Sequence, residues 1–223
     1  MSVDTVLFDL DSTLCRHCRS TDTILTEAFD RAGVEQYCTA TDLSAVANEV
    51  RAAESDIEFY TYCLEAVAER TEANPENANA VARAYDATID HFNVEFVSGA
   101  EAILRDLRDE YALGLVTNGG QYTQQEKLDA LDIEDAFDAL VFATPEEGVK
   151  PDSYPFERAL SALDASPDST MHVGDSLRAD VAGANAMGIT SVWIPHDDTD
   201  SEDGIEPDHT LDSLADLPAL LNG

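Results

Sequence analysis

The stretch VLFDLDSTLC, residues 6–15, passes directly from apolar residues into two aspartates that stand one residue apart. Side chains alternate along a strand, so Asp9 and Asp11 are expected to point to the same side where the strand ends. Two carboxylates on one side repel each other, and nothing in the adjoining sequence neutralises them. Either the strand end opens into water, or a positive group lies against the pair.

The rest of the chain divides into two kinds of sequence. Residues 21–92 carry helical periodicity almost throughout, including a helix predicted at 39–55, with Pro75 placed for the first turn of another. From Ser98 onward, helical segments such as the one at 177–188 alternate with short apolar runs. These runs include ALGLVTN at 112–118, ALVFA at 139–143 and TMHVGD at 170–175. Strands that alternate with helices are typical of a parallel sheet covered on both faces.

This alternation predicts the α/β fold class, with a doubly wound parallel-sheet core of the Rossmann type. The first strand belongs to the same sheet, so the helical block is an insertion that follows it. We expect residues 1–14 and 96–223 to form the α/β core domain and residues 15–95 to form an all-helical cap domain.

Composition limits the partners. The 223 residues include 46 acidic and 12 basic side chains, for a formal charge of −34, which disfavours nucleic acid and anionic membranes as partners. The N-terminal residues do not resemble a signal peptide, and no apolar run approaches the roughly 18 residues of a membrane span. We therefore expect a cytoplasmic, monomeric protein. The spread of acids resembles that of proteins from salt-loving organisms, which suggests a halophilic source.

Lysine and cysteine are both scarce. Lysine occurs only as Lys127 and Lys150, so each of the two merits attention. Cys15 and Cys18 form a C-x-x-C around His17, but the second C-x-x-C pair of a zinc ribbon is missing. We interpret them as two loop thiols. The arginines of the segment CRHCRS, residues 15–20, either solvate the turn or meet an anionic substrate.

Polar residues gather at the carboxyl ends of the predicted strands, where open α/β sheets bind ligands. They are Asp9, Asp11 and Thr13 after the first strand, Thr117 and Asn118 at the second, Lys150 after the third, and Asp175 and Asp180 after the fourth. Several carboxylates without a basic excess need a hard divalent cation, and oxygen ligands suit Mg²⁺. Such an ion, a lysine and glycine-flanked backbone N–H groups would cradle a phosphoryl group.

The segments FDLDST, VTNGG, GVKPDSYPFERAL and VGDSLRADVAGANAMG resemble, in order and context, the motifs of the haloacid dehalogenase superfamily of hydrolases. The resemblance implies that Asp9 is the nucleophile that attacks phosphorus. It implies that Asp11 is the general acid for the leaving group and then the base for water. Lys150 would neutralise charge between the nucleophile and the phosphate.

The same resemblance implies the remaining roles. Mg²⁺ would be held by Asp9, Asp175 and the backbone carbonyl of Asp11. Thr117 and Asn118 would bind the phosphate together with Lys150. Thr13 and Asp180 would contact these groups without touching the substrate, and Asp180 would orient Lys150 or a metal-bound water. The helical insertion corresponds to the cap that closes over small substrates. Ser12 stands where the family pattern has glycine.

Asp11 separates the two main chemistries of the family. Dehalogenase members lack an aspartate two residues after the nucleophile, since a halide needs no proton, so phosphatase chemistry is preferred. We expect a Mg²⁺-dependent phosphomonoester hydrolase for a small phosphorylated metabolite. Phosphomutase and 2-haloacid dehalogenase remain alternatives within the fold, and a receiver-type phospho-acceptor module is the rival from another class. The substrate stays open among phosphoglycolate, sugar phosphates, nucleoside monophosphates and acylneuraminate phosphates.

Overall fold

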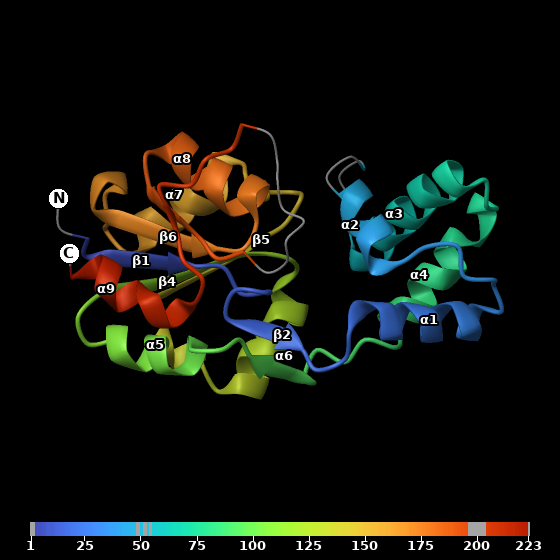
Figure 1. Cartoon of the computed structure of the whole chain (residues 1–223), viewed down its shortest axis with the longest axis horizontal. Coiled ribbons are helices and arrows are strands. Elements are labelled where there is room, and N and C mark those ends of the chain that lie inside the picture. Colours follow the sequence, from blue (N-terminus) through green and yellow to red (C-terminus); the bar gives the residue numbers. More distant parts are fainter. Residues whose placement is uncertain (1–2, 48–49, 51–52, 54, 196–203, 223) are drawn as a thin grey trace. The chain divides into compact units, whose positions relative to one another are not determined.

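The computed structural model of the chain describes residues 3–47, 50, 53, 55–195 and 204–222. The chain separates into two units (Figure 1). The first comprises Met1–Arg16 and Val94–Gly223, and the second is His17–Asn93.

A parallel sheet forms the centre of the first unit. Its strands are β1 (Thr5–Phe8), β4 (Ala112–Asn118), β5 (Ala139–Ala143), β6 (Thr170–Gly174), β7 (Thr190–Trp193) and β8 (His209–Thr210). Within the described residues they lie in the order β5-β4-β1-β6-β7-β8, with parallel pairing throughout. The chain thus winds outward from β1 in both directions, which confirms the predicted doubly wound α/β class.

Helices cover both faces of this sheet (Figure 1). One face carries α5 (Ala100–Leu107), α6 (Gln121–Leu131) and α9 (Leu217–Leu221), and the other carries α7 (Ser153–Ala162) and α8 (Ala182–Met187). Alternation along β1 sends Val6 and Phe8 into the core on the first face and Leu7 into the core on the second. Because both faces are buried, the strand reads as a continuous apolar run.

Two short strands were not predicted from the sequence. They are β2 (Cys15–His17) and β3 (Val94–Phe96), which pair with each other where the chain leaves the first unit and where it returns. Three residues are too few to show the alternation that marks a strand in a sequence.

The second unit is helical and has its own core. Its helices are α1 (Thr21–Ala32), α2 (Ala40–Ala47), α3 (Asp56–Thr71), a 3₁₀ turn (Pro75–Asn77) and α4 (Ala78–Asp86). Leu25, Phe29, Leu64 and Val81 are fully or almost fully buried among them. The helix predicted at 39–55 is described only as α2, and most of residues 48–54 lie outside the described residues. That this unit acts as a cap stays a prediction.

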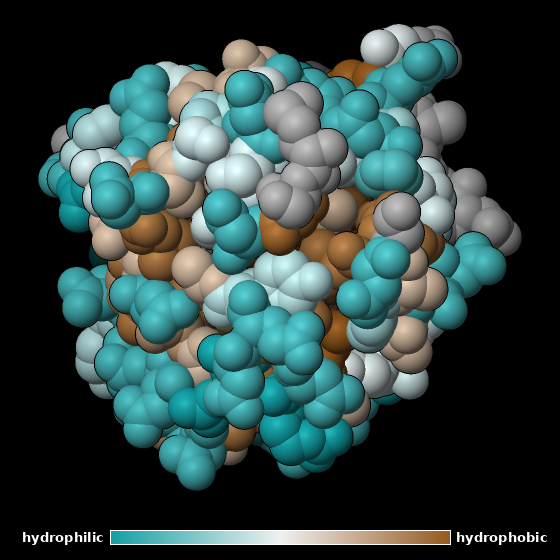
Figure 2. Space-filling view, turned by 90° about the vertical axis from the view of Figure 1, so that its left-hand side faces the viewer, coloured by the Kyte–Doolittle hydropathy of each residue, from teal (hydrophilic) through white to brown (hydrophobic). Residues whose placement is uncertain are grey.

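Hydrophilic residues dominate the face drawn in Figure 2, with hydrophobic side chains visible between them. This surface agrees with the 26% of charged residues in the chain. Within the part of the chain that the structure describes, no helix is both long enough and apolar enough to cross a membrane.

Candidate active site

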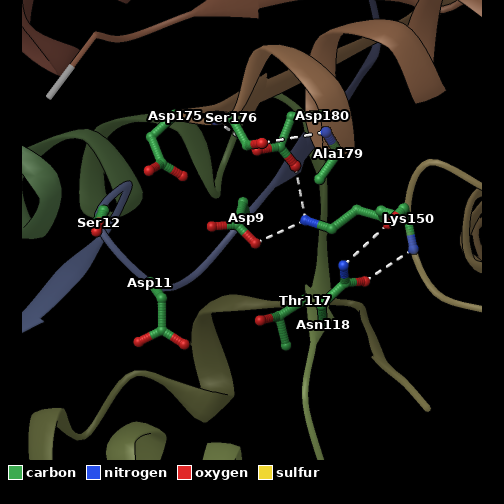
Figure 3. A pocket seen from close by; sticks show the side chains of 10 residues that line it. All are labelled: Asp9, Asp11, Ser12, Thr117, Asn118, Lys150, Asp175, Ser176, Ala179 and Asp180. Atoms are coloured by element: carbon green, nitrogen blue, oxygen red, sulfur yellow. Dashed lines mark hydrogen bonds and ion pairs between the residues drawn. The ribbon is translucent and has the colours of Figure 1, made fainter. Parts of the chain in front are cut away.

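A cavity of about 200 Å³ lies at the carboxyl ends of β1, β4 and β6, where the strand order reverses. Figure 3 shows side chains from these strand ends, and from the segment after β5, converging on it. Its lining residues are Asp9, Asp11, Ser12, Thr117, Asn118, Lys150, Asp175, Ser176, Ala179 and Asp180. The structure therefore brings the predicted site residues together, and Thr13 contacts Asp9 from behind.

Lys150 links two aspartates in the interior of the site. Its Nζ donates to Asp9 Oδ1 at 2.6 Å and to Asp180 Oδ1 at 2.7 Å. The side chains of Lys150, Asp9 and Asp180 are only 1%, 9% and 2% exposed. Of the two arrangements that the sequence left open for the strand end, the one with a positive group is found at Asp9.

Asp180 is held by donors on both of its oxygens. Oδ1 accepts from Lys150 and lies 2.9 Å from His172 Nε2, and Oδ2 accepts from the Ser176 backbone N–H at 3.0 Å. Burial lowers the pKa of His172, so the ring is neutral and its proton lies on the nitrogen that faces the carboxylate. Gly174 leaves room for this arrangement, since a Cβ there would overlap the side chain of Asp180.

One ammonium does not balance the negative charge of the site. Burial raises the pKa of Asp9 to about 7, even though Lys150 lowers it. Burial, with Asp9 and Asp180 adding to it, also raises the pKa of Asp175 well above its ordinary value. Burial would raise the pKa of Asp180 as well, but Lys150 and His172 hold that pKa below its ordinary value. Asp9 and Asp175 are therefore the carboxylates whose negative charge is not sufficiently offset by neighbouring positive groups.

The donor set fits a hard divalent cation. One carboxylate oxygen from each of Asp9, Asp175 and Asp180 lies within 4.8 Å of the other two. Carboxylate oxygens are the ligands that Mg²⁺ prefers. Both oxygens of Asp180 have partners at 2.7–3.0 Å, whereas among the described residues Oδ2 of Asp9 has only the 3.4 Å contact with Thr13. Asp9 and Asp175 are therefore the better placed pair to hold an ion.

Two predicted residues support the charged groups. Thr13 is fully buried, and its Oγ1 lies 3.4 Å from Asp9 Oδ2 and 3.5 Å from Asp175 Oδ1. The Asn118 amide binds the backbone of Lys150, since Oδ1 accepts from its N–H at 2.8 Å and Nδ2 donates to its carbonyl at 3.1 Å. Asn118 thus fixes the segment that presents Lys150, and its contact with substrate stays a prediction.

The carboxylate of Asp11 points away from Asp9 (Figure 3). Lys127, on α6, places its Nζ 2.7 Å from both carboxylate oxygens of Asp11. Gln124, one turn earlier, donates from Nε2 to Asp11 Oδ2 at 3.0 Å and lies 3.3 Å from Thr117 Oγ1. No role for Lys127 or Gln124 was predicted from the sequence. The signal that could have found Lys127 is the scarcity of lysine in the chain.

The turn after the first strand is strained at one residue. Ser12 has φ of 62°, in the left-handed region that glycine adopts without cost. The family pattern that has glycine at this position matches the backbone conformation found here, so the serine costs conformational energy.

The arginines after this turn have acidic partners. Arg16 pairs with Glu95 at 2.9 Å, and Arg19 pairs with Glu27 at 2.7 Å. These pairs are at the surface, which favours the interpretation that the arginines solvate their segments. Cys15 is buried and Cys18 is exposed, in line with two independent thiols.

Comparison with known families gives a match over most of the chain. The family described as haloacid dehalogenase-like hydrolase matches residues 6–194. This range contains the strand ends that form the cavity.

Two curated relatives are phosphatases. The chain is 30% identical to a glyceraldehyde 3-phosphate phosphatase of Pyrococcus furiosus over 125 residues, a match that spans 56% of this chain and 52% of the relative. It is 29% identical to a ribulose-1,5-bisphosphate 5-phosphatase of Halopiger xanaduensis over 97% of this chain and 98% of the relative.

A solved structure extends the likeness to the whole fold. It is the HAD-hydrolase YfnB from Bacillus subtilis, described as bound to magnesium, with a TM-score of 0.74, 20% identity and full coverage of both chains.

Proposed function

The chain belongs to the family of haloacid dehalogenase-like hydrolases, and we propose that within it the protein is a Mg²⁺-dependent phosphomonoester hydrolase. The observation that carries this proposal is the placement of Asp9 and Asp11 in one cavity beside Lys150 and Asp175. Two carboxylates with different partners in one cavity suit a nucleophile and a separate proton donor.

The size of the cavity supports a phosphoryl group as its occupant. At about 200 Å³ it is smaller than most pockets that enclose a whole ligand, which hold roughly 300–1,000 Å³. The phosphoryl group would lie within the cavity, and the organic part of the substrate would extend out of it. Lys150 and the hydroxyl of Thr117 are placed to bind phosphoryl oxygens there.

In the first half of the reaction, one carboxylate oxygen of Asp9 attacks phosphorus. The bond from phosphorus to the leaving oxygen breaks, and Asp11 gives its proton to that oxygen, so that an alcohol leaves. The products on the protein are an aspartyl-phosphate on Asp9 and an ionised Asp11. Lys150, 2.6 Å from Asp9, reduces the repulsion between the nucleophile and the anionic phosphoryl group.

In the second half, Asp11 takes a proton from water, and the water oxygen forms a bond to phosphorus. The bond between phosphorus and the Asp9 carboxylate breaks, which releases inorganic phosphate and returns both aspartates to their starting states. Mg²⁺ held by Asp9 and Asp175, and by the Asp11 carbonyl as the resemblance implies, would supply positive charge against the phosphoryl oxygens.

Two of the relatives support a sugar-like phosphoester as the substrate class. The two curated phosphatases are named for glyceraldehyde 3-phosphate and for the 5-phosphate of ribulose-1,5-bisphosphate. We propose a small phosphorylated metabolite of this kind for the present chain. The helical unit at His17–Asn93 would then be the cap that closes over it.

The test is a phosphate-release screen with and without Mg²⁺, at low and at high salt. The substrates are sugar phosphates, phosphoglycolate, nucleoside monophosphates and an acylneuraminate phosphate, and Asp9→Asn is the control that should be inactive. A 2-haloacid assayed for halide release addresses the dehalogenase alternative. Release of halide, or no phosphate from any ester under all these conditions, would refute the proposal.

A further inference from the structure

We propose that Lys127 and Gln124 are positioning residues that hold the Asp11 carboxylate for proton transfer to the leaving group. The proposal rests on the proposed function, because it assigns a task to residues that touch the predicted general acid and base. It concerns the orientation of the Asp11 side chain.

The contact between Lys127 and Asp11 is close and two-sided. Lys127 Nζ lies 2.7 Å from each carboxylate oxygen, which fixes the direction in which the carboxylate faces. The Lys127 side chain is 6% exposed, while that of Asp11 is 41% exposed. Lysine side chains are seldom buried, so the burial of Lys127 next to a half-exposed aspartate needs an explanation.

Gln124 connects this contact to the phosphate-binding part of the cavity. Its Nε2 lies within 3.3 Å of Asp11 Oδ2, Thr117 Oγ1 and the Asn118 carbonyl. Gly119 makes this position possible, because a Cβ there would stand 2.5 Å from Gln124 Nε2. Gln124 thereby joins the predicted proton donor to the predicted phosphate-binding hydroxyl through a single amide nitrogen.

The orientation that results suits an in-line displacement. The attacking and leaving oxygens lie on opposite sides of phosphorus, so a proton donor for the leaving oxygen must stay clear of the nucleophile. The Asp11 carboxylate points away from Asp9 (Figure 3), toward the α6 residues that bind it. Without those contacts a half-exposed carboxylate would turn among its rotamers, and small displacements of a catalytic group are costly.

The test uses two substrates that differ in how much their leaving groups need a proton. The leaving group of an alkyl phosphate is a strongly basic alkoxide, whereas the leaving group of p-nitrophenyl phosphate is a weakly basic phenolate. In Lys127→Met we expect kcat on the alkyl phosphate to fall at least about tenfold, a part of the roughly 10²–10⁴-fold that a positioned proton donor supplies. We expect kcat on p-nitrophenyl phosphate to fall much less.

Further variants separate positioning from general damage. Gln124→Met should show the same selective loss to a smaller degree, and Lys127→Arg should recover part of the alkyl phosphate turnover, since its guanidinium also donates to both oxygens. Arg105→Met removes a positive charge from a 67% exposed side chain on α5 and should leave both substrates unaffected. Thermal melts establish that each variant is folded.

The outcomes distinguish the two levels of inference. An equal loss of kcat on both substrates in folded Lys127→Met and Gln124→Met would show a structural role and overturn the positioning proposal alone. A wild-type protein that releases phosphate from neither of these esters nor from any ester of the screen would refute the proposed function and the positioning role with it. If Lys127→Met does not fold, the selective loss must appear in Gln124→Met, and its absence there would also overturn the proposal.

Discussion

Replacing Lys150 by methionine should cause a large loss of stability, because it removes the buried positive charge that two aspartates share. Methionine keeps most of the apolar length of the lysine and deletes only the ammonium. Asp9 and Asp180, at 2.6 and 2.7 Å from that ammonium, would remain as buried carboxylates without their common partner.

The size of the loss follows from burial and distance. At an effective dielectric constant of about 20, unit charges about 2.7 Å apart attract by roughly 6 kcal/mol. Desolvation offsets much of that attraction, and removing one partner of a buried pair costs about 3–5 kcal/mol. Since two carboxylates depend on Lys150, we expect the free energy of unfolding to fall by about 4–5 kcal/mol at neutral pH.

The loss should also depend on pH. In the wild type, Lys150 keeps the pKa of Asp180 below its ordinary value, despite burial. Asp180 therefore adds stability above its unfolded pKa of about 3.9, and that stability disappears as the pH falls through its lower folded pKa. The difference between wild type and Lys150→Met should accordingly shrink as the pH falls below about 3.9 and Asp180 becomes protonated in the unfolded chain.

The assay is urea unfolding at fixed ionic strength, with a chelator present so that no divalent cation replaces the missing charge. Lys127→Met is the matched comparison, because the partner of Lys127 is 41% exposed and can be hydrated. Arg105→Met, at the surface, should stay within about 0.5 kcal/mol of the wild type. A cost for Lys150→Met no larger than that for Lys127→Met would refute the reasoning.

Three further predictions concern the metal ligands and two turns. Added Mg²⁺ should raise the Tm of the wild type, by an amount equivalent to about 2.7 kcal/mol of stability at 100 times Kd. It should raise the Tm of Asp175→Asn far less. Equal shifts in the two proteins would exclude Asp175 as a ligand. Gly174→Ala should lose about 1–3 kcal/mol in urea unfolding because its Cβ overlaps Asp180, whereas Gly120→Ala, whose Cβ meets nothing nearer than 3.9 Å, should not show this overlap penalty. Ser12→Gly should gain up to about 1 kcal/mol by relieving a left-handed serine, and a loss on this substitution would contradict the strain.

The parallel sheet was predictable because its strands differ sharply from their surroundings. β4 and β5 have the same bounds as the apolar runs ALGLVTN and ALVFA. In β1 the side chains of Leu7 and Phe8 enter cores on opposite faces of the sheet, which explains an apolar run without alternation. A strand that is buried on both faces is apolar along its whole length, so it can be recognised from a single sequence.

Local irregularities were less predictable, since neighbours in space decide them. The helix expected at 177–188 begins as a π-helical turn, Leu177–Val181, and becomes α-helical only from Ala182. Asp180 lies in that turn, where its carboxylate receives Lys150 from a segment 30 residues earlier. The sequence of residues 177–188 alone does not indicate the contact between Asp180 and Lys150.

The two lysines of the chain show where sequence reasoning reached its limit. The paired carboxylates of Asp9 and Asp11 left two interpretations open, an opening into water or a positive group. Only Lys150 was predicted to lie at the site, although the scarcity of lysine drew attention to Lys127 as well. Both are at least 94% buried as side chains, and each binds a different member of the pair. This division could not be deduced from the sequence, because it depends on how α6 packs beside the first strand, 116 residues away along the chain. Separate cations bind the two carboxylates, an arrangement that suits the proposed division between a nucleophile and a proton donor.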